Sequence, residues 1–156
     1  MSWIDAQEWG LERLERLAAW LDAALGRVRG MAPHLATGLR GEREALFELR
    51  RRGYTIVGRR WKDGRVPGDL DLIGWQDGRL CFIEVKTRTA RDAMPAESAV
   101  GQHKRRMVRR LARLYLQRFP DAERRTIPVR FDVVSVYRIA GVSEFEVFTG
   151  AYGWRR

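Results

Sequence analysis

The stretch that most constrains the fold runs from residue 69 to residue 88 and reads DLDLIGWQDGRLCFIEVKTR. Two mainly apolar runs flank the dipeptide Asp77-Gly78, which favours a two-residue type I′ turn because both positions tolerate positive φ. A hairpin closed by this turn pairs Gln76 with Arg79, and every facing pair then has residue numbers that sum to 155. The sequence therefore predicts a β-hairpin of known register.

This register brings four charged side chains onto one face of the hairpin. Asp71 is expected to face Glu84, and Asp69 is expected to face Lys86. Facing Cβ atoms lie about 4.5–5.5 Å apart, so the two opposed carboxylates repel each other. A divalent cation would make this pairing favourable, because Mg²⁺ takes oxygen ligands from one or two carboxylates together with substrate phosphate. The alternative, an ordinary ion pair between Asp69 and Lys86 on an exposed face, leaves the two opposed acids unexplained.

Length and charge limit the class of protein. The chain has 156 residues and a formal net charge of +10, which is enough for one domain with a core and too short for two full domains. The charge favours polyanionic partners, either nucleic acid or an anionic membrane, although an inert basic surface has the same composition. Cys81 is the only cysteine, which fits a reducing compartment. With no apolar run of spanning length and no secretory signal, a soluble cytoplasmic protein is predicted.

Residues 1–37 are expected to form an N-terminal amphipathic helix and a glycine-rich linker. Apolar side chains recur at helical spacing between Ser2 and Arg29, which predicts a helix. The segment GRVRGMAPHLATG, residues 26–38, predicts the linker. The helix either packs on the main domain or pairs with a second copy. Its acidic residues oppose binding to anionic lipid, so no stable membrane association is predicted.

Residues 38–156 are expected to form the main α/β domain. Their pattern predicts, in order, a helix that stops at Gly53, a strand, the hairpin, a long helix and two more strands. These elements are expected at residues 39–52, 54–61, 69–88, 98–119, 127–137 and 145–148. The order predicts an α/β fold in which helices flank a mixed central sheet.

Both helices of this domain carry further candidate site residues. Glu42 lies on the apolar stripe of the first helix, where a carboxylate is costly to desolvate unless a positive group meets it. Its position near the helix N-terminus, where the dipole favours a carboxylate, explains it equally well. The long helix has a basic face that either contacts phosphate or is simply solvated. This face consists of Gln102, Arg106, Arg109 and Arg113.

The hairpin carries a resemblance to a nuclease superfamily. Asp71, followed on the next strand by Glu84, Val85 and Lys86, is similar to the PD-(D/E)xK motif. The segments GLRGEREALFELRRRGYTIVGRRW, GDLDLI, FIEVKTR, AESAVGQHKRR and RFDVVSV together resemble the YraN, or UPF0102, family over residues 38 to about 137. That family is largely uncharacterised and is assigned to the restriction-endonuclease-like fold.

The first helix of the domain adds a second resemblance. The segment from Glu42 to Gly53 is similar to the first helix of archaeal Holliday-junction resolvases, which carries a metal-site glutamate at the same distance before a glycine and an aromatic residue. Two positions depart from the family pattern: Asp69 stands where the family has Glu, and Arg60 where it usually has Asn. Neither belongs to the core of the motif.

The resemblance implies a metal-dependent endonuclease. Asp71, Glu84, the backbone carbonyl of Val85 and Glu42 would hold Mg²⁺ or Mn²⁺, and Lys86 would orient the attacking water or stabilise the transition state. Further contacts to nucleic acid are expected from the basic helix face. They are also expected from Arg88, on the same side of its strand as Lys86, from Lys104, which matches the family pattern, and more weakly from Gln102.

The expected substrate is nucleic acid, DNA rather than RNA, with branched or flapped DNA as one option. Resolvase-like nucleases commonly act as symmetric pairs, so a homodimer is an alternative to a monomer. The alternative function is a non-catalytic nucleic-acid-binding or scaffold protein that retains the nuclease fold. The intact set of Asp71, Glu84 and Lys86 favours the nuclease, because a pure binder has no need for opposed carboxylates.

Overall fold

The structure is a computed structural model that describes residues 32–90 and 100–154. Within the chain, Gly38–Arg156 form one compact unit. The predicted N-terminal helix lies outside the described residues, so the expected division into two domains stays a prediction.

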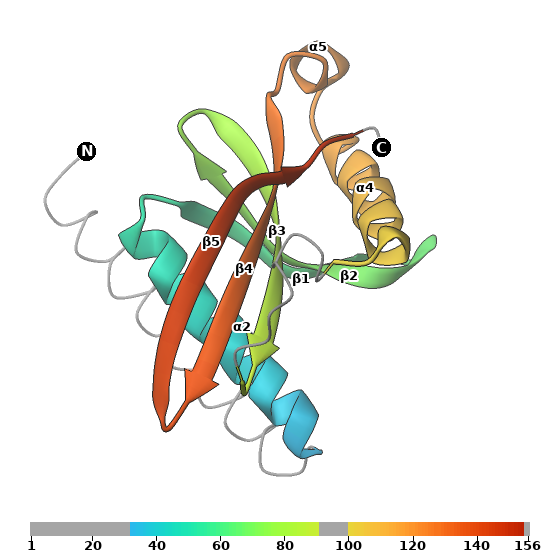
Figure 1. The fold of residues 1–156 in the computed structure, drawn as a ribbon. Helices are drawn as coiled ribbons and strands as arrows, with labels where there is room; N and C mark the ends of the chain where they lie inside the picture. The colour runs from blue at the N-terminus through green and yellow to red at the C-terminus, as the bar shows by residue number, and fades with distance from the viewer. Residues whose placement is uncertain (1–31, 91–99, 155–156) are drawn as a thin grey trace, which may run out of the picture. The chain divides into compact units, whose positions relative to one another are not determined.

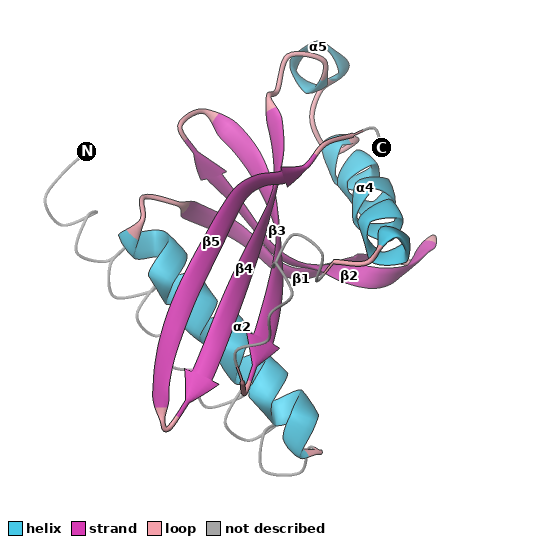
Figure 2. Ribbon diagram, in the orientation of Figure 1, coloured by secondary structure: helices cyan, strands magenta, loops and turns pink. Residues whose placement is uncertain are grey.

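Five strands form a single mixed sheet in the order β1-β2-β3-β4-β5 (Figure 1). Neighbouring strands are antiparallel except β3 and β4, which are parallel and are connected through helix α4. The strands are β1 (Thr55–Asp63), β2 (Val66–Gln76), β3 (Arg79–Arg88), β4 (Val129–Ile139) and β5 (Val142–Tyr152). Together with the helices in Figure 2 they confirm the predicted class, a mixed sheet flanked by helices, and this arrangement is consistent with a restriction-endonuclease-like fold.

Helix α2 spans Pro33–Arg51 and ends as predicted at a glycine. Gly53 has φ +86° and donates its N–H to the carbonyl of Arg50, while Tyr54 donates to the carbonyl of Leu49. These two hydrogen bonds form a Schellman motif. The predicted linker is wrong over residues 33–38, where the helix has already begun. Proline is tolerated there because the first helical position needs no N–H donor.

Helix α4 spans Gln102–Leu116, beginning four residues later than predicted, and the short α5 spans Asp121–Arg124. Helices α2 and α4 pack on opposite faces of the sheet, as strand alternation requires. Leu72 and Ile83 belong to the core with α2, whereas their neighbours Ile73 and Phe82 belong to the core with α4. None of the described helices is long and apolar enough to cross a membrane.

One prediction for α4 is wrong. Arg109, expected on the exposed basic face, is only 8% exposed. Its Nε donates to the carbonyl oxygen of Gly153 at 2.7 Å, and its guanidinium lies 5.4 Å from the ring centroid of Tyr152. The segment after β5 covers this side of the helix, which helical spacing cannot reveal. Gln102, Arg106 and Arg113 are exposed as expected.

One buried acid outside the hairpin motif, Asp132, has a structural role. Asp132 of β4 is fully buried and accepts hydrogen bonds from the hydroxyl of Tyr54 at 3.0 Å, Nε of Arg130 at 2.8 Å and the backbone N–H of Gly150 at 2.8 Å. A buried carboxylate with this many donors is well compensated. We therefore assign Asp132 to the fold.

Candidate functional site

The β2–β3 hairpin has the predicted turn and, near that turn, the predicted register. Asp77 and Gly78 have φ values of +51° and +71°. Facing pairs run from Gln76 and Arg79 up to Leu72 and Ile83. Beyond this pair β2 continues only beside β1, whereas β3 continues beside β4. The two strands of the hairpin therefore separate where Asp71 and Glu84 would have faced each other.

Asp71 lies at this point of separation. Its Oδ2 accepts a hydrogen bond from the backbone N–H of Val85 at 2.8 Å, so a side chain takes an amide that a ladder partner would otherwise bind. The predicted facing pair of Asp71 and Glu84 is therefore not part of the backbone ladder. The two acids still interact: burial, and then the charge of Glu84, raise the pKa of Asp71 to about 7. The charge of Lys104 and the Val85 hydrogen bond act in the opposite direction.

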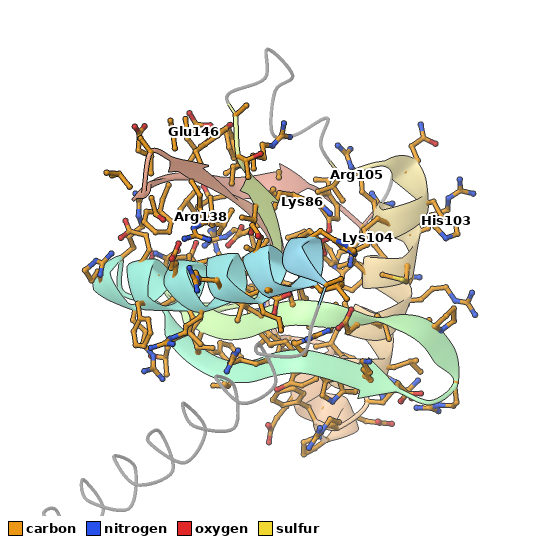
Figure 3. All side chains as sticks on the ribbon, turned by 90° about the horizontal axis from the view of Figure 1, so that it is seen from below. Lys86, His103, Lys104, Arg105, Arg138 and Glu146 are labelled. Carbon is orange, nitrogen blue, oxygen red and sulfur yellow. The ribbon has the colours of Figure 1, made fainter. Side chains whose placement is uncertain are left out.

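Glu84 is 2% exposed and lies between two lysines. Nζ of Lys86 is 2.9 Å from its Oε1, and Nζ of Lys104 is 3.1 Å from its Oε2. Figure 3 shows Lys86 on β3 and Lys104 at the start of α4, with His103 on the outer side of that helix. The expected pairing of Lys86 with Asp69 is wrong, because Asp69 instead lies 3.4 Å from Nε of Arg60.

Nearby negative charges also determine the pKa of Lys104. Burial lowers its pKa, but the negative charges of Glu84 and Asp71 outweigh burial and hold the pKa above its ordinary value. Although Lys104 is within ion-pair distance of Oε2 of Glu84, that oxygen has no donor in hydrogen-bond geometry among the described residues. Oε2 of Glu42 is likewise buried without a hydrogen-bond partner in the described part of the chain. Oε2 of Glu42 thus retains acceptor capacity, whereas Oε2 of Glu84 is already balanced by the charge of Lys104.

Glu42 reaches the cluster through a close contact between helix and strand. At the preceding residue, Gly41, a Cβ would lie 1.8 Å from Oγ1 of Thr87 in β3, so glycine is needed for α2 to approach so closely. Oε2 of Glu42 is 4.0 Å from Nε of Arg60. Burial is the main cause that raises the pKa of Glu42, and the charge of Arg60 opposes it. The charges of Asp69 and, less strongly, Glu84 also raise this pKa, so Glu42 interacts electrostatically with both acids.

The backbone conformation at Arg60 bears on one of the two departures from the family pattern. Its φ is +44°, in the left-handed region that asparagine populates more readily than most residues. The usual Asn at this position therefore suits the backbone, while Arg60 adds a positive charge beside Glu42 and Asp69.

The structure brings together only some of the predicted site residues. Glu42, Asp71, Glu84, Lys86 and Lys104 form one acid–lysine cluster. Val85 belongs to it through its backbone N–H. Half-buried Arg88 lies farther along β3. The remaining expected contacts on α4 lie outside the cluster. Arg109 is buried under the C-terminal segment, whereas three residues are exposed: Gln102, Arg106 and Arg113.

Sequence reasoning missed Tyr152. This tyrosine ends β5, and its hydroxyl is buried without a hydrogen-bond partner among the residues that the structure describes. Burial, followed by the charges of Glu84 and Asp71, raises its pKa above the ordinary value. The last strand was predicted to end at residue 148, whereas β5 continues to Tyr152. A longer strand prediction through TGAY would have placed this side chain on the sheet.

The donor set suits a hard cation. No group of three or more His, Cys, Asp or Glu side chains within residues 32–90 and 100–154 is arranged to hold a metal ion. Mg²⁺, however, is usually bound by one or two carboxylates with substrate phosphate and water, not by an all-protein cage. The adjoining acids Asp71 and Glu84, together with Oε2 of Glu42, would offer such a cation its carboxylate ligands.

Fold and cluster together define the class of protein: a mixed α/β domain, consistent with a restriction-endonuclease-like fold, whose central hairpin opens around two buried acids and two partly exposed lysines. More specifically, the chain belongs to the uncharacterised protein family UPF0102, whose family model matches residues 41–136. It is 47% identical over 119 residues to a UPF0102 protein of Koribacter versatilis, covering 76% of this chain and 80% of the relative. A UPF0102 protein of Solibacter usitatus is 45% identical over 96 residues, covering 62% of this chain and 70% of the relative. One from Porphyromonas gingivalis is 39% identical over 106 residues, covering 68% and 74%.

Proposed function

We propose that this protein is a metal-dependent endonuclease that hydrolyses phosphodiester bonds of nucleic acid, DNA rather than RNA. The observation that carries the proposal is the convergence of Asp71, Glu84, Lys86 and Lys104 where β2 leaves β3. Burying two interacting carboxylates costs stability, and strongly perturbed acids with specific charged partners are typical of functional sites. The fully hydrogen-bonded Asp132 shows how this same sheet buries an acid for purely structural purposes.

The residues of the cluster have distinct roles in this mechanism. A Mg²⁺ or Mn²⁺ ion held by Asp71, Glu84, the Val85 carbonyl and Glu42 would supply hydroxide near neutral pH and offset charge on the phosphate. The N–H of Val85 holds the Asp71 carboxylate in one orientation. Lys86 and Lys104 each hold an ammonium group at one oxygen of Glu84, from where they would stabilise negative charge that develops on the phosphate oxygens.

Cleavage assays test this proposal. Single-stranded, duplex, flap and four-way DNA, and the matching RNA, are incubated with Mg²⁺, with Mn²⁺ and with chelator. We expect cleavage only with metal, and a rate at least about 100-fold lower for Glu84→Gln and for Lys86→Ala. Lys62→Ala, which removes an exposed lysine of β1, is the matched control and should retain the full rate. Activity that survives both site substitutions would exclude this site.

A second function has an observation in its favour. Both oxygens of Glu84 lie within ion-pair distance of a lysine, so its charge is balanced without a metal. A nucleic-acid-binding or scaffold protein with this fold would bind the substrates of the panel and cleave none of them with either metal. The symmetric pairing typical of resolvases also remains part of the nuclease proposal, and sedimentation equilibrium with and without four-way DNA measures it.

A further inference from the structure

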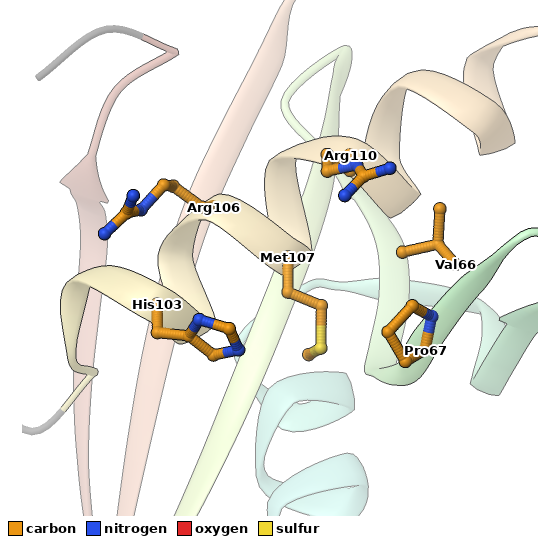
Figure 4. Close-up of a pocket in the computed structure, with 6 residues that line it drawn as sticks. All are labelled: Val66, Pro67, His103, Arg106, Met107 and Arg110. Carbon is orange, nitrogen blue, oxygen red and sulfur yellow. The ribbon is translucent and has the colours of Figure 1, made fainter.

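Helix α4 and the β1–β2 turn enclose a groove outside the acid–lysine cluster. It consists of two adjoining cavities of about 270 and 390 Å³ that share Val66 and Arg110 in their walls. Figure 4 shows the first cavity, whose other lining residues are Pro67, His103, Arg106 and Met107. The second is lined also by Arg65, Arg113, Leu114 and Gln117. We call these two cavities together the α4 groove.

The α4 groove is lined by basic side chains and by apolar ones. Helix α4 reads QHKRRMVRRLARLYL and contains no acid. Its groove residues recur every three or four positions, which places them on one face of the helix. Arg106 and Arg110 form no ion pair with any described carboxylate, whereas Arg65 of the second cavity is paired with Asp63. Arginines outside the groove are also paired: Arg51 and Arg52 with Glu48, and Arg124 with Asp121.

The groove ends beside the candidate active site. Gly68 has φ +92°, and a Cβ there would lie 2.2 Å from Sδ of Met107, so β2 and α4 are in close contact at the groove. Asp69 and Asp71 follow directly along β2. At the start of α4, Lys104 contacts Glu84 while the adjacent His103 lines the groove. The groove follows the helix from His103 to Gln117, about 21 Å at 1.5 Å per residue.

We propose that the α4 groove binds the sugar–phosphate backbone of the nucleic-acid strand that leads away from the cleavage site. This inference rests on the function proposed above, although binding itself requires no cleavage. Arg106 and Arg110 contact phosphates, and the apolar side chains of Val66, Pro67 and Met107 contact sugars. Contacts of this kind carry little sequence information and depend strongly on salt. An open groove along the helix, bordered by the β1–β2 turn, fits a strand, whereas a membrane surface is bound by a helix that lies flat on it.

Binding measurements with a matched control test the proposal. The variant Arg106→Ala/Arg110→Ala removes two charges from the groove. Arg79→Ala/Arg125→Ala removes two exposed charges that line neither cavity. The affinity for a fluorescein-labelled DNA oligonucleotide, single-stranded and duplex, is measured by anisotropy in chelator over a series of KCl concentrations.

We expect the groove variant to bind at least about tenfold more weakly than the parent protein. The slope of log affinity against log salt should fall by about 1.4 for single strands or about 1.8 for duplex, two phosphate contacts in each case. The control variant should keep most of the parent slope. Equal losses in the two variants would overturn the proposal, because they would mean that only net charge matters. Matching thermal unfolding midpoints establish that both variants are folded.

Two further measurements separate this inference from the nuclease proposal. If the groove variant loses DNA binding while the parent protein cleaves nothing with Mg²⁺, the groove stands and the nuclease proposal fails. If the variant binds and cleaves like the parent protein, the groove proposal fails and the nuclease stands. Co-sedimentation with phosphatidylserine vesicles tests a membrane as the alternative partner. Binding to vesicles that requires Arg106 and Arg110, with no binding to DNA, would overturn the assignment to nucleic acid.

Discussion

Oε2 of Glu84, in strand β3, lies 3.1 Å from Nζ of Lys104, in helix α4. The contact joins the crossover helix to the strand that it follows, and it places a second lysine beside the Glu84–Lys86 pair of the hairpin motif. Lys104 therefore belongs to the acid–lysine cluster even though it is 18 residues away from Lys86 in the sequence.

The Glu84–Lys104 contact predicts a measurable coupling energy. Lys104→Met keeps the apolar stem but leaves Glu84 with one cation, so we expect the free energy of unfolding to fall by about 1–3 kcal/mol, less than for a buried pair with no second partner. In a double-mutant cycle with Glu84→Gln, urea unfolding should give a coupling of at least about 0.5 kcal/mol. Lys62→Met, on an exposed position, should stay within about 0.5 kcal/mol of the parent protein. Additive effects of the two site substitutions would contradict the contact.

The raised pKa of Asp71 predicts how stability depends on pH. The pKa of this carboxyl is about 7 in the folded chain against an ordinary 3.8, so its stabilising contribution is complete below about pH 4 and is lost as pH rises through 7. In chelator, the parent protein should therefore lose a few kcal/mol relative to Asp71→Asn over this range. Denaturant unfolding at several pH values measures the difference. Asp77→Asn, in the exposed turn, should follow the parent protein, and a flat difference for Asp71→Asn would contradict the prediction.

Mg²⁺ should reverse this loss. A cation that binds only the folded state stabilises it in proportion to its occupancy, and its ligands must be ionised. At pH 7 and above, millimolar Mg²⁺ should raise the unfolding midpoint of the parent protein more than that of Asp71→Asn. Equal shifts in the two proteins would argue against Asp71 as a ligand.

We expect glycine-to-alanine substitution to have opposite effects at two positions of α2. Gly41→Ala would press a methyl group onto Thr87, with a Cβ 1.8 Å from its Oγ1, so the helix must shift and we expect a loss of about 1–3 kcal/mol. Gly38→Ala meets no described atom within 4 Å and should stabilise the helix by about 0.5–1 kcal/mol. Thermal unfolding measures both. A stabilising Gly41→Ala would show that the helix does not need its close approach.

We expect Tyr152→Phe to lower activity without destabilising the fold. Phenylalanine removes a buried hydroxyl that has no described hydrogen-bond partner, so the unfolding midpoint should not fall. Because that hydroxyl interacts with the charges of Glu84 and Asp71 and has no described acceptor, it would be available to donate to a substrate phosphate. We expect the cleavage rate to fall by about tenfold or more, the value of one hydrogen bond to a charged group, with DNA affinity unchanged. Tyr137→Phe, whose hydroxyl donates to Glu146, is the matched control for activity. Unchanged cleavage by Tyr152→Phe would remove it from the site.

Local patterns predicted much of the fold. Asp77-Gly78 specified the hairpin turn and the first five facing pairs, because turn type and register are set by adjacent residues. Gly53 marked the end of α2, since a left-handed residue is a local requirement. The helix start was missed at Pro33, and β5 was predicted too short. Those boundaries depend on packing partners far away in the sequence.

The sequence by itself determined the order of the described elements except the short α5, together with the hairpin and the acids and lysine that it carries. Only the tertiary structure decided where β2 leaves β3, so that Asp71 takes the Val85 amide and no longer faces Glu84 in the ladder. It also decided that Lys104 contacts Glu84 and that Arg109 is covered. The physical reason is that helical and strand spacing specify which face a side chain occupies, whereas the partner opposite that face comes from distant parts of the chain.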